Sequence, residues 1–232
     1  MRKNNLIICM ALYGIAALIP GIGAAQIPPA SEEIAHYKGL HAAAFSGDLA
    51  AIEKLIKAKA DLNSRDPYGR TPLHVATHAR KPDAVRMLMR AGANHALLER
   101  DRYDAVTIAS VADDEATLRV LLAEGASAKL TTSRYDGTAL IAAAHLGHAG
   151  VVRQLIAAGA PLDHVNNLHW TALIESIVLG NGGPRHTETL RLLVQAGANL
   201  QLTDRNGNTP LRLAKGRGYQ AMVEILEKAG AK

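Results

Sequence analysis

The sequence predicts an all-α fold built from repeated helical units, and three observations support this. A helix-opening segment of the type TPLHVA recurs six times, with starts separated by 33, 33, 34, 33 and 38 residues. A second signal runs in phase with it, because Lys59-Ala60 and then five Gly-Ala pairs follow the second helix of each unit. Apolar residues recur at helical spacing between the two signals. The six openers begin at Lys38, Thr71, Asp104, Thr138, Thr171 and Thr209.

The opener of the second unit shows why these segments begin helices. Thr71 has a hydroxyl that can accept from the free N–H groups of the first turn. Pro72 suits the first helical position, where a missing N–H costs nothing. Leu73 and Ala76 then fall on one face of the predicted helix. Glycine at the other end accepts the left-handed conformation that ends a helix.

The second helices carry an apolar stripe in every unit from the second to the sixth. In the fourth unit it consists of Val151, Val152, Leu155 and Ile156. The other stripes are Val85, Leu88 and Met89; Leu118, Leu121 and Leu122; Leu190, Leu192 and Leu193; and Val223, Ile225 and Leu226. We expect these residues in the core, and we expect the arginines between them to face water: Arg86, Arg90, Arg119, Arg153 and Arg191.

The TPLHVA segment at this period resembles the signature of the ankyrin repeat family, and the phased Gly-Ala pairs support the resemblance. It covers residues 31–232, with repeats at about 33–65, 66–98, 99–131, 132–165, 166–203 and 204–232. The resemblance implies a solenoid of about six helix-turn-helix repeats linked by β-hairpin-like fingers. Since no unit buries its apolar side alone, the six form one cooperative domain. It also implies a non-catalytic protein–protein interaction module.

The first 25 residues have the organisation of a signal peptide. Arg2 and Lys3 precede an apolar run over residues 6–19, and small residues end at Ala25. We expect cleavage after Ala25, a linker over residues 26–30, and a periplasmic protein with no membrane attachment. The alternative is an uncleaved helix that tethers a scaffold to the membrane. Cys9 is the one cysteine, so cleavage would leave a chain with no disulfide and no thiol chemistry.

Charge and motifs favour neither nucleic-acid binding nor catalysis. The formal charge is +5, and loss of Arg2 and Lys3 would leave +3, which is a weak argument for nucleic acid. No motif of a serine hydrolase, zinc protease or P-loop enzyme occurs. His145 and His148 have a spacing that could hold a metal, although His148 matches the family's turn histidine and no third ligand is adjacent. We expect no cofactor and no metal, and a metal-binding or enzymatic protein is the less favoured alternative.

The candidate partner-binding surface follows the predicted fingers. Five aromatic residues recur once per unit just before the opener: Tyr37, Tyr68, Tyr103, Tyr135 and Trp170. The finger arginines are Arg70, Arg100, Arg102, Arg134 and Arg205. Inner-helix residues would complete a concave surface: Phe45, His78, Val111, His145, Leu146, Val178, Leu179 and Arg217. Tyrosine, tryptophan and arginine dominate binding hot spots, so we expect a monomer that binds another protein here. The alternative is that the rings pack finger against finger and bind nothing.

Two units depart from the pattern. The third has DAVTIA as its opener, without Thr-Pro and without histidine, and Arg102 replaces the finger glycine. We expect this unit to stack less firmly. The fifth carries about five extra residues, which we expect to form a longer loop over residues 180–188.

Overall fold

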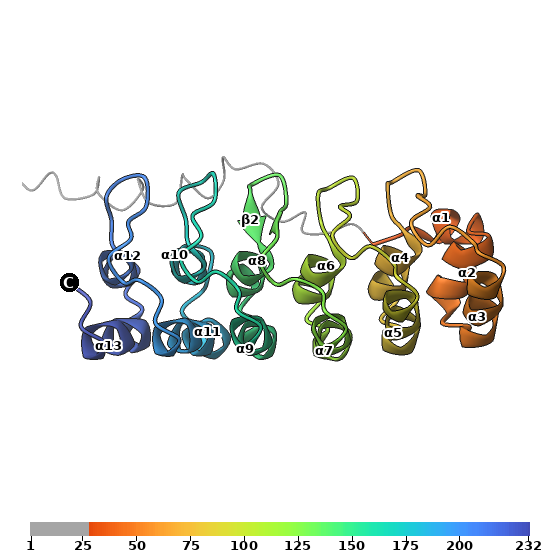
Figure 1. Cartoon of the computed structure of the whole chain (residues 1–232). Coiled ribbons are helices and arrows are strands. Elements are labelled where there is room, and N and C mark those ends of the chain that lie inside the picture. Colours follow the sequence, from red (N-terminus) through yellow and green to blue (C-terminus); the bar gives the residue numbers. More distant parts are fainter. Residues whose placement is uncertain (1–27) are drawn as a thin grey trace, which may run out of the picture.

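The computed structural model describes residues 28–232, which form one row of stacked helix pairs (Figure 1). The predicted signal peptide, residues 1–25, and the start of the predicted linker lie outside the described residues. A short helix, α1 (Ser31–Ala35), precedes the first pair. The inner helices are α2 (Gly39–Ser46), α4 (Pro72–His78), α6 (Ala105–Val111), α8 (Ala139–Leu146), α10 (Ala172–Val178) and α12 (Pro210–Gly216). The outer helices are α3 (Leu49–Lys57), α5 (Pro82–Arg90), α7 (Glu115–Ala123), α9 (Ala149–Ala157), α11 (Pro184–Gln195) and α13 (Gln220–Lys228).

Five loops project from the same side of the row, beyond the inner helices (Figure 1). We call them finger 1 (65–70), finger 2 (98–103), finger 3 (131–137), finger 4 (165–170) and finger 5 (203–208). Finger 3 contains a short antiparallel pair, β1 (Thr131–Thr132) and β2 (Gly137–Thr138), in which Thr131 is opposite Thr138. Helix pairs joined by such fingers confirm the predicted fold class.

The helix openers act as the sequence predicts. In α4, α8, α10 and α12 the threonine before the helix accepts from a backbone N–H three residues later, and Pro72 and Pro210 occupy the first turn. In the third unit Asp104 replaces this threonine, and its carboxylate accepts from the N–H of Thr107 at 2.9 Å. The cap is therefore kept with a different side chain, and lower stability of this unit stays a prediction.

A continuous core runs along the row between the inner and outer helices. Leu73, Leu88, Leu118, Leu140 and Leu155 are almost completely buried. Most residues of the predicted outer-helix stripes are buried with them, whereas Leu122, Ile156, Leu192 and Ile225 are partly buried at its edge. Because each pair buries its apolar side against both neighbours, the repeats depend on one another for stability.

Buried and half-buried histidines hydrogen-bond between successive repeats. The Nε2 of His74 donates to the Leu97 carbonyl at 3.0 Å, and that of His41 donates to the Arg70 carbonyl at 3.0 Å. The Nδ1 of His148 donates to the Ser110 carbonyl at 2.9 Å. Burial lowers the pKa of His74 to about 4, which keeps its ring neutral near pH 7. His41 and His74, which occupy the histidine position of the helix opener, therefore each link one repeat to the next.

The extra residues of the fifth unit do not form the predicted loop over residues 180–188. Pro184 begins α11, which has 12 residues where α9 has 9. Three residues' worth of the insertion therefore lengthens a helix. Proline at the first position explains the start, because its fixed φ suits a helix N-terminus. The added turn lets the Arg185 guanidinium reach Asp113 of the third unit at 2.9 Å, past the fourth unit.

Candidate functional site

Each finger is closed by one polar side chain that faces into its own turn. In finger 1 an Asp66 carboxylate oxygen accepts from the N–H groups of Tyr68 at 2.9 Å and Arg70 at 2.8 Å. Glu99 accepts in the same way in finger 2, Asn166 in finger 4 and Asp204 in finger 5. Such local hydrogen bonds hold a tight turn without a larger sheet.

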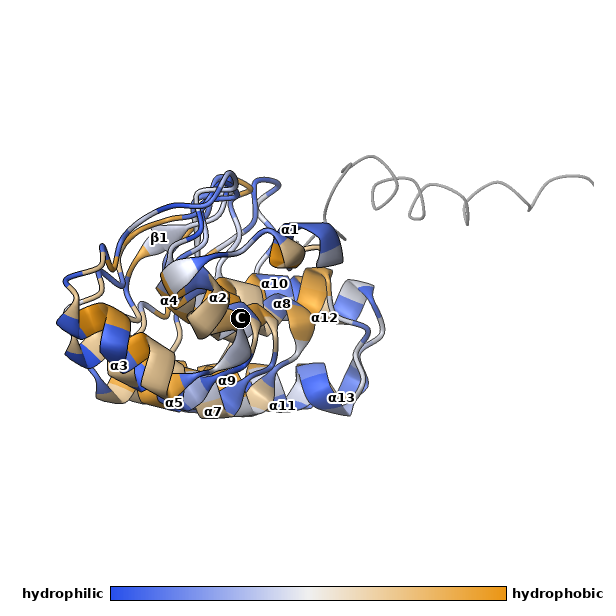
Figure 2. Ribbon diagram, turned by 90° about the vertical axis from the view of Figure 1, so that its right-hand side faces the viewer, coloured by the Kyte–Doolittle hydropathy of each residue, from blue (hydrophilic) through white to orange (hydrophobic). Residues whose placement is uncertain are grey.

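Neighbouring fingers are also bonded to each other through the backbone. The N–H of Arg100 donates to the Tyr68 carbonyl at 2.9 Å, that of Ser133 to the Arg102 carbonyl at 2.8 Å, and that of Asn167 to the Tyr135 carbonyl at 3.0 Å. Fingers 1 to 4 therefore form a connected row. Viewed along the array, the fingers lie together on one side of the helices and are drawn mostly in hydrophilic colours (Figure 2).

The sequence left open whether the finger aromatics form an exposed binding surface or pack finger against finger, and their burial lies between these two extremes. Tyr68, Tyr103, Tyr135 and Trp170 are all half-buried, so each side chain keeps part of its surface open to water. Burial raises the pKa of Tyr103. Two of the predicted arginines are clearly exposed, Arg102 with 52% and Arg134 with 69% of the side-chain surface accessible.

Tyr37 lies outside the fingers, and Arg70 lies in finger 1 but is buried, so neither has the exposed finger position that the prediction gave it. Tyr37 lies between α1 and α2 and not in a finger, and its hydroxyl donates to Asp66 at 3.0 Å. Burial raises its pKa to about 12. Arg70 is 2% exposed, and its guanidinium lies 2.6 Å from Glu33 and 4.7 Å from the centre of the Tyr68 ring. Both residues hold α1 against finger 1, so neither offers a free surface to a partner.

The predicted inner-helix residues lie at the ends of their helices. His78 ends α4, His145 and Leu146 end α8, and Leu179 directly follows α10. All four are half-buried. Burial lowers the pKa of His78 to about 3 and lowers the pKa of His145, so both rings are neutral near pH 7. These side chains supply neutral, largely apolar contact area rather than charge.

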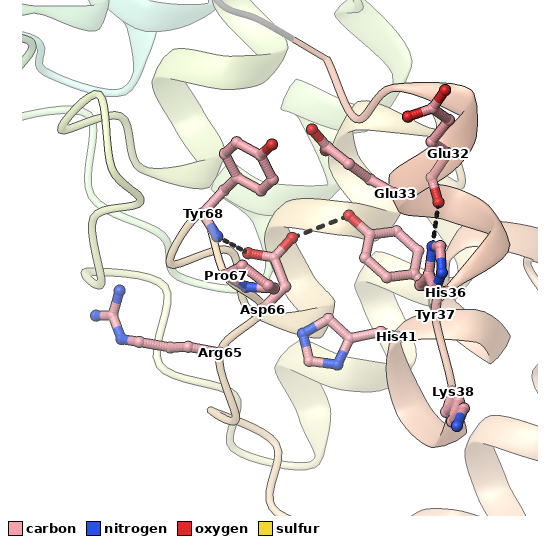
Figure 3. Close-up of a pocket in the computed structure, with 10 residues that line it drawn as sticks. All are labelled: Glu32, Glu33, His36, Tyr37, Lys38, His41, Arg65, Asp66, Pro67 and Tyr68. Atoms are coloured by element: carbon pink, nitrogen blue, oxygen red, sulfur yellow. Dashed lines mark hydrogen bonds between the residues drawn. The ribbon is translucent and has the colours of Figure 1, made fainter.

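A hollow of about 580 Å³ lies at the first end of the finger row, between α1 and finger 1 (Figure 3). Its lining includes Glu32, Glu33, His36, Tyr37, Lys38, His41 and residues 65–68. Its central carboxylate, that of Asp66, receives hydrogen bonds from Tyr37 and from the Tyr68 N–H (Figure 3). Glu33 likewise pairs with Arg70. Asp66 and Glu33 therefore help to hold α1 against finger 1.

The sequence reading missed a buried carboxyl group under the concave surface. Glu175 of α10 is 5% exposed, and its Oε1 accepts from the Asn166 amide at 2.8 Å. Its Oε2 lies 3.6 Å from the Nδ1 of His145. Burial raises the pKa of Glu175 to about 8. A signal was present, because aligned openers carry Val75, Ile108 or Ala142 at this position.

Two kinds of site can be assessed over residues 28–232. No three histidine, cysteine, aspartate or glutamate side chains gather there in a group that could hold a metal ion. No helix in this part of the chain is long and apolar enough to cross a membrane.

A row of antiparallel helix pairs with linked fingers defines a repeat-type binding scaffold, and comparison with known proteins identifies its class. The family model for ankyrin repeats (3 copies) matches residues 40–133, 106–204 and 140–232. The chain therefore belongs to the ankyrin repeat family, whose domains are protein–protein interaction modules.

Similar proteins occur in bacteria and in animals. The chain is 32% identical to the ankyrin repeat protein YahD of Escherichia coli K12 over 190 residues, 82% of this chain and 94% of YahD. An ankyrin repeat domain of Acinetobacter baumannii is 44% identical, with a TM-score of 0.79 over 83% of this chain and 98% of that one. A chain in the structure of a Bdellovibrio bacteriovorus predatory endopeptidase in complex with an immunity protein is 27% identical, with a TM-score of 0.68 over 83% and 98%.

Proposed function

We propose that this chain is an exported, non-catalytic protein that binds a folded partner through the fingers and the adjacent ends of the inner helices, and that it stabilises or inhibits that partner in the periplasm. The observation that carries the proposal is the connected finger row. Backbone hydrogen bonds between fingers fix the relative positions of Tyr103, Tyr135 and Trp170 before any partner arrives.

A fixed surface of this kind suits recognition for an energetic reason. Association costs free energy whenever loops and side chains must become ordered, and a surface ordered in advance avoids that cost. The half-buried rings add rigid contact area, and the neutral ends of α4, α8 and α10 extend it toward the concave side. A surface that binds by area needs no reacting groups, in keeping with a binding protein.

The inhibitory role has support from one similar structure. A chain of the same fold occurs in the structure of a predatory endopeptidase in complex with an immunity protein. By analogy, we propose that the partner here is an exported enzyme. Export itself rests on the basic, apolar and small-residue segments of residues 1–25.

The binding proposal is tested by capture from periplasmic extract with the tagged full-length protein, followed by mass spectrometry. We expect one dominant partner, whose capture is lost when Tyr135 and Trp170 are both changed to alanine. The matched control is Arg119→Ala with Arg153→Ala on the outer helices, which should capture the partner as well as the wild type does. Circular dichroism must show the same helical content in both variants. Equal capture by the two variants would place the binding surface elsewhere.

Export is tested separately by expression in a bacterial host and by intact-mass measurement of the periplasmic fraction. We expect the mass of a chain that begins at Gln26. A full-length mass in the membrane fraction would support the tethered scaffold instead. Full-length protein in the cytosol would overturn export.

A further inference from the structure

Five arginines follow one another along the finger row: Arg65, Arg100, Arg102, Arg134 and Arg205. All five are exposed, and each contacts an adjacent finger. The Arg65 guanidinium donates to the Leu98 carbonyl at 2.8 Å. That of Arg205 donates to the Asn167 carbonyl at 3.0 Å. These contacts hold the charged groups in place while leaving much of each guanidinium open to water.

The other three arginines also contact an adjacent finger. The Arg100 guanidinium lies 5.6 Å from the centre of the Tyr68 ring. Arg102 lies 3.4 Å from Asp136, and Arg134 pairs with Asp101. Rings and carbonyls do not neutralise a guanidinium, and exposed ion pairs are weak enough to exchange for a better acceptor. The row therefore presents ordered positive charge.

The acidic residues of the fingers are mostly turned away from this surface. Asp66, Glu99 and Asp204 point into their own turns, where backbone N–H groups occupy them. Only Asp101 and Asp136 remain among the arginines, so five outward cations face two outward anions in the described fingers. On the outer helices most arginines pair with acids, as in Arg86–Asp83, Arg90–Glu124 and Arg191–Glu188, whereas in the finger row two of the five do.

Finger 4 interrupts the charge, because it has neither an arginine nor an acidic residue and carries apolar side chains. Val165 is 42% exposed, and Leu168 and Trp170 are half-buried beside it. A partner that lies along the row would thus meet guanidinium groups on fingers 1 to 3 and an apolar surface on finger 4. This order of chemistry fits a protein segment that has both acidic and apolar side chains.

We propose that the finger row binds an acidic segment of the partner protein, whose carboxylates contact the arginines of fingers 1 to 3 and whose apolar side chain contacts finger 4. This rests on the proposed function and adds the chemistry of the partner. Arginine is suited to the task because its planar donors match a carboxylate in a bidentate contact. Nucleic acid fits less well, since the stacking of bases needs open aromatic faces and the finger rings are half-buried.

The test uses fluorescent peptides as probes and the full-length protein. One peptide has ten glutamates followed by a leucine, a second has glutamine in place of every glutamate, and a third probe is a thymidine oligonucleotide of similar length. We expect fluorescence anisotropy to show binding of the acidic peptide alone, with affinity that falls as salt rises. The triple variant Arg100→Gln, Arg102→Gln, Arg134→Gln should lower that affinity by about tenfold or more. The control Arg119→Gln with Arg153→Gln should leave it unchanged.

Equal binding of the acidic and the glutamine peptides would overturn the proposal, as would equal losses in the finger variant and the control. Tighter binding of the oligonucleotide would assign the row to nucleic acid instead. Failure here is distinguishable from failure of the proposed function. If the captured partner is lost with the Tyr135 and Trp170 variant but kept with the arginine variant, the module binds its partner without an acidic contact.

Discussion

Changing Glu175 to glutamine should remove a large source of pH dependence in the stability of the array. The carboxyl group is buried in α10 beneath the concave surface, with an Asn166 amide on one oxygen and the ring of His145 near the other. Burial lowers the pKa of His145 as it raises that of Glu175, so near pH 7 a neutral ring faces a protonated acid. Glutamine has the same shape and retains an oxygen that accepts from Asn166.

The magnitude follows from linkage between protonation and folding. The pKa of Glu175 rises from 4.5 to about 8 in the folded chain, whereas the unfolded chain loses its proton near 4.5. The folded state therefore holds one proton more between these values, and stability falls as pH rises through that window. At about 1.4 kcal/mol per pKa unit, the wild type should lose on the order of 4 kcal/mol relative to the glutamine variant between about pH 5 and pH 9.

The assay is urea unfolding followed by circular dichroism, with both proteins measured at about pH 5, 7 and 9. Other titrating groups contribute equally to both proteins, so the difference between the two stabilities isolates Glu175. We expect the variant to be the more stable protein at pH 9 and the difference to shrink toward pH 5. A difference that does not change with pH would refute the reasoning. It would mean that Glu175 loses its proton at the same pH in the folded and the unfolded chain.

Three further predictions concern how the repeats are held together. His74→Gln should be less stable near pH 7 by about 1–2 kcal/mol, since contacts to Thr71 and Leu97 are lost. The variant should also lose less stability than the wild type as pH falls from 6.5 toward 4, because the wild-type ring is neutral when folded and protonates when unfolded. Urea unfolding at several pH values measures this difference. Asp104→Ala should cost about 1–2 kcal/mol and Asp104→Thr much less in the same assay, since threonine can restore the cap. Arg185→Ala should change the unfolding free energy by less than about 1 kcal/mol, because its pair with Asp113 is half exposed, and a larger loss would make the lengthened α11 a true brace.

The repeat architecture could be predicted because its signals are local. Thr71 and Pro72 define a helix start by their own chemistry, and the glycine of each Gly-Ala pair defines an end. Gly92, for example, has a φ of 95°, the left-handed value that glycine adopts without strain. Such signals need no knowledge of distant residues, and six copies in phase reinforce one another.

The burial or exposure of individual finger residues could not be predicted, because it depends on contacts between units. The sequence placed both Arg70 and Arg102 on the predicted binding surface, since each belongs to a finger and lies near an aromatic residue. Arg70 is buried because Glu33 of α1, 37 residues earlier, supplies a carboxylate at 2.6 Å. Arg102 pairs instead with Asp136, which is itself exposed, and Arg102 therefore stays exposed. Its backbone has a positive φ of 66°, which glycine would favour.

The same reasoning explains why the surface chemistry emerges only from the fold. In sequence order the fingers alternate acids and bases, as in Glu99, Arg100, Asp101 and Arg102, and their charges nearly cancel. Folding separates them, because the turn needs an acceptor for its own N–H groups and takes Glu99 inward, where burial raises the pKa of the carboxyl group. Arginine has no acceptor to offer these N–H groups, and Arg65, Arg100, Arg102, Arg134 and Arg205 stay exposed. The positive row is thus a consequence of how each turn satisfies its backbone.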